Sequence, residues 1–257
     1  MNRLQKLFSQ KRNQILSVYL TSGYPEINDT ARIIKALEKS GADFIEIGLP
    51  FSDPVADGPT IQRSSEIALE NGMSTEVLFE QIKDIRKEVQ LPLLIMGYIN
   101  PIIQYGVEAF CKKAAEIGID GMILPDLPMQ EYLDDYKAIF EKYNLSNIFL
   151  ITPQSSEERV RWIDENSNGF IYMVATAGTT GTRTGITAEQ IAYFEKIKAM
   201  NLKNVPIVGF GISDKTSFDT ACQYVGGAII GSAFIKALDN QGSLEERIDD
   251  FIKSVKK

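Results

Sequence analysis

Short, nearly uninterrupted apolar runs recur along this chain at fairly regular intervals. They are ILSVYLT (15–21), FIEIG (44–48), PLLIMGY (92–98), GMILPD (121–126), NIFLIT (147–152), FIYMVA (170–175), PIVGFG (206–211) and GAIIGS (227–232). Apolar side chains at successive positions indicate strands that are buried on both faces, as in a parallel sheet. The sequence therefore predicts eight parallel strands.

Amphipathic stretches separate these runs and predict helices over 27–41, 74–89, 107–118, 155–166 and 187–200. Eight strands alternating with helices are most economically closed into a (β/α)8 TIM barrel of the α/β class, because an open sheet would leave two edges to cover. The rival is a doubly wound sheet, but TSGYPE follows the first strand where a dinucleotide-binding fold would carry GxGxxG. No linker divides the chain, so we expect one domain over 1–257 with a short N-terminal helix.

Composition narrows the classes of function. The 257 residues suffice for one barrel, and a formal net charge of −7 without a long Lys/Arg run argues against nucleic-acid and membrane partners. The chain has no histidine, and its two cysteines, Cys111 and Cys222, are far apart, so a Ser-His triad, a zinc site and a disulfide framework are not indicated. The charged segment MNRLQKLFSQKRNQ lacks the apolar stretch of a signal peptide, which predicts a cytoplasmic protein.

Barrel enzymes carry their chemistry on the loops at the carboxyl ends of the strands. Two of these loops are long, 49–62 with three prolines and two aspartates, and 176–190 with many Gly and Thr. Glu46 lies inside an apolar strand, and if it points into the barrel its pKa should rise toward the range of a general acid or base. Asp53 and Asp57 lie in the first long loop, where aspartates also form ordinary turns.

Two late glycine segments, GFGIS (209–213) and GSAFIK (231–236), are each expected to end a strand and enter a helix. Backbone N–H groups at such points bind anions, and phosphate sites of barrels are built from the loops after strands seven and eight. Gly181 could close a third side. Apolar side chains expected near the mouth suit an aromatic body beside a phosphate, although they could equally be barrel core: Tyr19, Tyr98, Ile151, Tyr172 and Phe210.

None of the eight runs contains a lysine, which argues against a Schiff-base aldolase, and no clustered ligand set indicates a metal. The remaining reading is a phosphorylated small molecule acted on by carboxylates.

The run FIEIGLPFSDPVADGPTIQ (44–62), followed by GFGIS and GSAFI, closely resembles the α subunit of tryptophan synthase, and the similarity extends along the whole chain. The resemblance implies a barrel enzyme that cleaves indole-3-glycerol phosphate to indole and glyceraldehyde 3-phosphate without a cofactor. It also implies an α2β2 complex in which indole passes to a pyridoxal-phosphate β subunit.

By this resemblance, Glu46 and Asp57 are the catalytic pair, and Thr180 helps Asp57 adopt its working position when the loop closes. The other implied substrate-binding residues are Tyr19, Tyr98, Tyr172, Gly181, Gly209, Phe210, Gly211, Gly231 and Ser232. The implied contacts with the β subunit are Asp53, Asn100, Asp126 and Pro128. The chain departs from many members at TSGYP (21–25) and ATAGTTGTRTG (175–185). A free-standing indole-releasing lyase and a non-catalytic, phosphate-binding regulatory barrel remain as alternatives.

Overall fold

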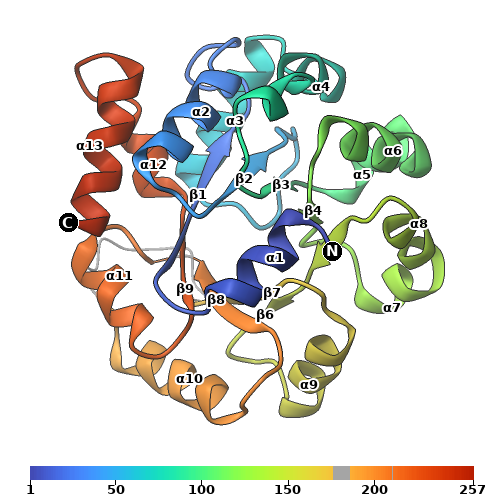
Figure 1. Cartoon of the computed structure of the whole chain (residues 1–257), viewed down its shortest axis with the longest axis vertical. Coiled ribbons are helices and arrows are strands. Elements are labelled where there is room, and N and C mark those ends of the chain that lie inside the picture. The colour runs from blue at the N-terminus through green and yellow to red at the C-terminus, as the bar shows by residue number, and fades with distance from the viewer. Residues whose placement is uncertain (176–185, 210) are drawn as a thin grey trace.

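Parallel strands form the centre of this computed structural model, which describes residues 1–175, 186–209 and 211–257 (Figure 1). Among these residues nine strands pair in the order β5-β4-β3-β2-β1-β9-β8-β7-β6. Their bounds are β1 (Ile15–Thr21), β2 (Phe44–Gly48), β3 (Leu93–Met96), β4 (Gly121–Ile123), β5 (Ser146–Ile148), β6 (Leu150–Ile151), β7 (Phe170–Val174), β8 (Val205–Gly209) and β9 (Gly227–Ile230).

The two ends of this strand order meet at Phe149. β5 and β6 are separated by that residue alone, and β5 pairs with β4 whereas β6 pairs with β7. The Phe149 carbonyl also accepts a hydrogen bond from the backbone N–H of Tyr172. The segment 146–151 therefore acts as a single barrel strand that changes partner halfway, and the predicted eight-stranded barrel is confirmed.

Helices surround the barrel (Figure 1). Their bounds are α1 (Arg3–Gln10), α2 (Thr30–Ser40), α3 (Pro59–Glu70), α4 (Thr75–Ile82), α5 (Ile99–Tyr105), α6 (Val107–Ile117), α7 (Met129–Glu131), α8 (Lys137–Lys142), α9 (Glu157–Asn166), α10 (Ala188–Ala199), α11 (Lys215–Cys222), α12 (Ser232–Ala237) and α13 (Leu244–Lys256), with a 3-10 turn at Ile85–Lys87 and a π turn at Tyr132–Tyr136. The five predicted helices are confirmed, although 74–89 divides into α4 and the 3-10 turn. Within the described residues, no helix has the length and apolarity needed to cross a membrane.

Side chains of each strand alternate between the barrel interior and the helices. On β2, Phe44 belongs to the cluster inside the barrel, while Ile45 and Ile47 belong to the cluster under the helices. Ile151, expected near the mouth, packs in the cluster under the helices, so that expectation was wrong. Its β-partner Met173 lies in the same cluster, because paired residues of neighbouring strands share a face.

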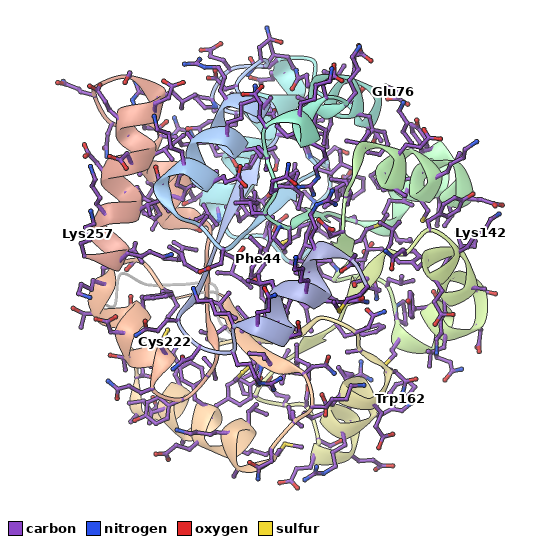
Figure 2. The ribbon with its side chains drawn as sticks, viewed as in Figure 1. Phe44, Glu76, Lys142, Trp162, Cys222 and Lys257 are labelled. Atoms are coloured by element: carbon purple, nitrogen blue, oxygen red, sulfur yellow. The ribbon has the colours of Figure 1, made fainter. Side chains whose placement is uncertain are left out.

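The helix α1 closes the end of the barrel opposite the loops that carry the site. Its Leu4 and Phe8 are buried in the interior cluster, and the Phe8 ring lies 5.4 Å from that of Phe170. Phe44 completes this aromatic group, 5.2 Å from Phe170. Figure 2 shows Phe44 at the centre of the molecule, whereas Glu76 and Lys142 lie at its edge.

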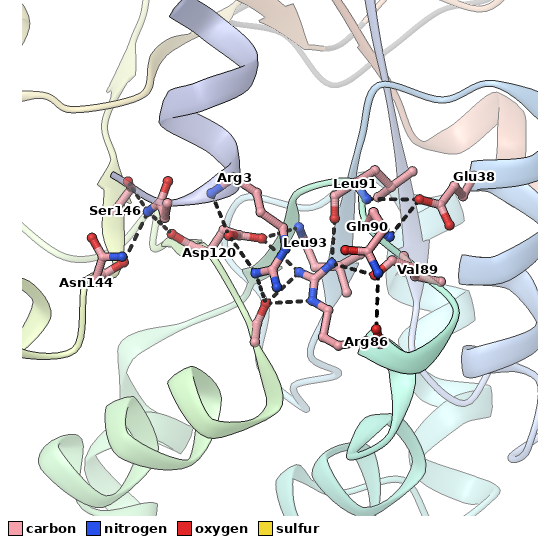
Figure 3. Close-up of polar contacts among 12 residues, drawn as sticks. Arg3, Glu38, Arg86, Val89, Gln90, Leu91, Leu93, Asp120, Asn144 and Ser146 are labelled. Atoms are coloured by element: carbon pink, nitrogen blue, oxygen red, sulfur yellow. Dashed lines mark hydrogen bonds and ion pairs between the residues drawn. The ribbon is translucent and has the colours of Figure 1, made fainter.

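A buried carboxylate ties α1 to two strands (Figure 3). Asp120, 1% exposed, accepts hydrogen bonds from the Arg86 guanidinium at 2.8 Å and from the backbone N–H of Leu93 at 3.0 Å. Its other oxygen accepts the backbone N–H of Arg3 at 3.1 Å, and its carbonyl accepts the Asn2 amide. One side chain thereby fixes the start of α1, of β3 and of β4.

Replacing the Asp120 carboxylate tests how much it contributes to the stability of the fold. We expect Asp120→Asn to lower the free energy of unfolding by about 3–5 kcal/mol, because the half-buried Arg86 would lose its counter-charge. The measurement is the urea midpoint at an unchanged slope. Asp84→Asn is the control, since it removes an exposed pair with Lys87 and should leave the midpoint near that of the parent. Equal midpoints for both variants would contradict the assignment.

Candidate active site

A cavity of about 110 Å³ opens among the loops that follow β2, β8 and β9. This is the carboxyl end of the strands, where barrel enzymes place their chemistry. The cavity is lined by Tyr19, Asp57, Ile61, Met96, Tyr172, Gly211, Ile212, Ile229, Gly231 and Ser232. Six of these were predicted from the sequence, namely Tyr19, Asp57, Tyr172, Gly211, Gly231 and Ser232.

Glu46 points into the barrel. It shares the inner face of β2 with Phe44, is 0% exposed, and neither carboxyl oxygen has a hydrogen-bond partner among the described residues. Burial raises the pKa of Glu46 well above its ordinary value, because a charge there would lose its hydration. The carboxyl lies beside the phenols of Tyr19 and Tyr172, which line the cavity. The result is a proton-holding group next to the cavity.

Asp57 lies in the loop between β2 and α3 and is half-buried. Its carboxylate accepts a hydrogen bond from the Tyr98 hydroxyl at 3.1 Å, and its carbonyl accepts the Gln62 amide at 2.8 Å. Burial raises the pKa of Asp57, and the bond from Tyr98 opposes that rise. The two carboxyl groups thus have different environments: among the described residues Glu46 has no hydrogen-bond partner, whereas Asp57 has a donor that favours its anion. Such a difference can separate an acid from a base.

Two glycines make room for the tyrosines. A Cβ at Gly48 would lie 2.0 Å from the Tyr19 hydroxyl, and one at Gly209 would lie 2.1 Å from the Tyr172 hydroxyl. Each glycine lies on the strand next to its tyrosine, two positions beyond the residue that pairs with that tyrosine, so any larger residue would displace a phenol from the site. Gly209 therefore has a packing role that sequence reasoning missed, and its predicted contact with phosphate stays a prediction.

The predicted anion site is only partly built as expected. β9 ends at Ile230 and α12 begins at Ser232 with Gly231 as its N-cap, so the second glycine segment does enter a helix. The first does not, because α11 begins only at Lys215 and Asp214 caps it by accepting the backbone N–H of Ser217. A carboxylate already satisfies that helix terminus. The expectation of two convergent helix ends was wrong.

Not every predicted site residue is described by the structure, and the structure adds site residues that the sequence did not predict. Thr180, Gly181 and Phe210 are outside the described residues, and their predicted roles stay predictions. Tyr98 lines a smaller neighbouring cavity with Phe51 and Asp57. Sequence reasoning missed the apolar lining, Ile61, Met96, Ile212 and Ile229. Met96 and Ile229 lie near the carboxyl ends of β3 and β9, where reading the inward alternation could have found them.

The residues predicted to face a partner are all exposed, and they lie in the loops or the first helical turn that follow three adjacent strands, β2, β3 and β4. They are Asp53, Asn100, Asp126 and Pro128. Val55, in the loop of Asp53, is 84% exposed, which is high for an apolar side chain. Across the described ranges, no group of three or more His, Cys, Asp or Glu side chains could hold a metal ion.

Comparisons with known proteins agree with this geometry. The family model described as tryptophan synthase alpha chain matches residues 4–257. The chain is similar to the tryptophan synthase alpha chain of Flavobacterium johnsoniae, with 61% identity over 100% of both chains. It is also similar to that of Parabacteroides distasonis, with 51% identity over 100% of both.

Solved structures give the same result. The tryptophan synthase alpha chain of Legionella pneumophila superimposes with a TM-score of 0.87 at 33% identity, covering 99% of this chain and 96% of that one. A tryptophan synthase chain from M. tuberculosis gives 0.85 at 31% identity, covering 99% and 98%. The barrel, the whole-length match and the high identity lead to one conclusion: this chain belongs to the tryptophan synthase alpha chain family.

Proposed function

We propose that this chain cleaves indole-3-glycerol phosphate to indole and glyceraldehyde 3-phosphate, with Glu46 and Asp57 as the catalytic pair. As a member of its family the chain is the lyase component of tryptophan synthase. The observation that carries the residue assignment is the buried Glu46 carboxyl, which has no partner among the described residues. Glu46 pairs across the sheet with Tyr19, and Tyr19 and Asp57 line the same cavity. A buried polar group without a partner costs stability and is explained by a role in chemistry.

The reaction is a retro-aldol cleavage and needs three proton movements. Glu46, held neutral by burial, gives its proton to indole C3, and the indole N–H moves toward Asp57, which stabilises the positive charge on the ring. The resulting carboxylate of Glu46 then takes the proton of the glycerol hydroxyl beside the breaking bond. The C3–C bond breaks, its electron pair returns to the ring, and an aldehyde forms. Glu46 ends protonated, as it began.

The cavity supports the placement of substrate. Gly211, Gly231 and Ser232 line the cavity, and the backbone N–H groups at the start of α12 can bind a phosphate. Tyr19 and Tyr172 lie with Met96 on the same cavity and offer apolar surface for the indole ring. Phosphate binding would position the reacting bond, which is a large part of catalysis in a site of this kind.

We propose that the exposed loops after β2, β3 and β4 bind a β subunit, as in the α2β2 complex of this family, and that residues 1–257 act as one domain. The described cysteines, Cys111 and Cys222, are free thiols, which fits a reducing compartment, and we place the protein in the cytoplasm. The presence of both carboxylates argues against a purely regulatory barrel. Turnover with and without a β subunit separates the complex from a free-standing lyase.

Release of indole from indole-3-glycerol phosphate tests the function directly. The parent protein should release indole, and Glu46→Gln should lower kcat by at least about a hundredfold, because the amide keeps the shape but cannot transfer the proton. Binding of glycerol 3-phosphate, measured by calorimetry, should be retained. A variant that keeps more than a few per cent of the parent rate would return Glu46 to a structural role.

Glu46 should also make stability depend on pH. Its folded pKa is raised above the ordinary value of 4.5, so its contribution to the free energy of unfolding is fully present below about pH 4.5 and is lost as pH rises through the folded pKa. The Glu46→Gln variant has no ionisable group at this position, so its free energy of unfolding does not decrease with pH for this reason. We expect the difference in urea midpoint between variant and parent to grow in favour of the variant with rising pH. The exposed Glu116→Gln controls for the loss of one charge, and a difference independent of pH would contradict the burial argument.

The anion wall is best tested at Gly231. A Cβ there would make ordinary contacts of 3.5 Å with Tyr19 and 3.7 Å with Ile61, whereas Gly211 has φ +82°, where any side chain strains the backbone. We expect glycerol 3-phosphate to raise Tm less in Gly231→Ala than in the parent, and less again in Gly231→Val. Each tenfold loss of affinity removes about 1.4 kcal/mol of the binding free energy that stabilises the folded protein. Undiminished protection of the Val variant would place the phosphate elsewhere.

A further inference from the structure

Tyr98 contacts the loop that carries Asp57 at three points. Its ring packs against that of Phe51 with centroids 5.2 Å apart, and its hydroxyl accepts the backbone N–H of Ala56 at 3.0 Å. The same hydroxyl donates to Asp57 Oδ2 at 3.1 Å. One side chain, 5% exposed, therefore touches the start and the end of segment 51–57.

The two hydrogen bonds fix the direction of the Tyr98 proton. A backbone N–H can only donate, so the hydroxyl oxygen must accept from Ala56. The single phenolic hydrogen is then left for Asp57, which must accept it. Since an ionised carboxylate is a stronger acceptor than a neutral one, this arrangement selects the charged form of Asp57.

The bond also decides which carboxylate oxygen is available. Oδ2 is bound by Tyr98, and across the described residues Tyr98 is the hydrogen-bond partner of this carboxylate. Asp57 lines the 110 Å³ cavity as well, so Oδ1 is left to meet a donor on a molecule bound there. The N–H of an indole ring is such a donor.

The backbone on the other side of Tyr98 is anchored too. Tyr98 is the N-cap of α5, and the next backbone N–H, of Ile99, donates to both oxygens of Asp126 at 3.0 and 3.2 Å. Asp126 comes from the loop after β4, the neighbour of β3 in the sheet. The position of the Tyr98 hydroxyl is thus set by two adjacent barrel loops and not by the loop that it holds.

From these contacts we propose that Tyr98 is a positioning residue, whose hydrogen bond orients Asp57 and favours its charged form so that Oδ1 can accept the substrate N–H. The proposal rests on the function proposed above and assigns Tyr98 a role through Asp57, distinct from contact with the substrate. Among the described residues, the other titratable groups that interact electrostatically with Asp57 are the phenols of Tyr19 and Tyr172, from β1 and β7.

Tyr98→Phe tests this, because the ring keeps its packing on Phe51 and only the hydroxyl is lost. The first measurement is the titration of 13C-labelled aspartate carboxyls in the ligand-free protein, with Asp57→Asn to assign the signal. We expect the pKa of Asp57 to rise in the variant, since the bond from Tyr98 lowers it in the parent. The second is indole release across pH. We expect kcat about tenfold lower, KM within about twofold, and the acid limb of the profile at higher pH.

Tyr143→Phe is the matched control, since it removes a tyrosine hydroxyl from a carboxylate, Glu108, at 3.2 Å on the surface. It should follow the parent in both measurements. The proposal is overturned if Tyr98→Phe leaves either the Asp57 titration or kcat unchanged. A parent that released no indole would refute the proposed function, and the carboxyl titration would still decide whether Tyr98 holds Asp57 in its charged form.

Discussion

The alternation of side chains in a closed parallel sheet governs the rest of this structure. Inside the barrel there is room for one set of side chains only, and on β2 that set runs from Phe44 through Glu46 to Gly48. The first packs on α1 at one end, and the last yields its space to the Tyr19 hydroxyl at the other. Glu46 lies between them. Its burial follows from the strand register, in which it pairs with Tyr19 and Leu94, and needs no separate device.

The two carboxyl groups of the site, Glu46 and Asp57, come from a strand and from a loop. The strand holds a carboxyl whose pKa burial raises, and the loop holds a carboxyl whose charged form is favoured by a hydrogen bond from a phenol. Two groups of the same chemical type can therefore do opposite work at one pH. Gly48 and Gly209 have a related effect, because a strand position without a side chain lets the neighbouring strand place a large phenol at the mouth, that of Tyr19 or of Tyr172.

The strands could be predicted because their burial on both faces is written as consecutive apolar residues, and Glu46 stood out because it interrupts such a run. The partner change at Phe149 could not, since it depends on which strands lie on either side. Tyr98 and Asp57 are 41 positions apart, so no local pattern joins them. The Asp214 cap was readable in principle, because an acceptor three residues before Ser217 is a local signal.

The helix α1, which closes one end of the barrel, also bears on how the chain folds. Leu4 and Phe8 of α1 lie in the same cluster as Ile207 and Ile229, which belong to the last two strands along the chain, β8 and β9. The helix α1 is synthesised early, but part of the surface on which it packs comes from strands that are synthesised late. Contacts between residues so far apart in the sequence are slow to form. Until β8 and β9 are in place, the apolar face of α1 has no complete core to enter. Closing the sheet and burying this helix therefore depend on the same contacts between early and late parts of the chain.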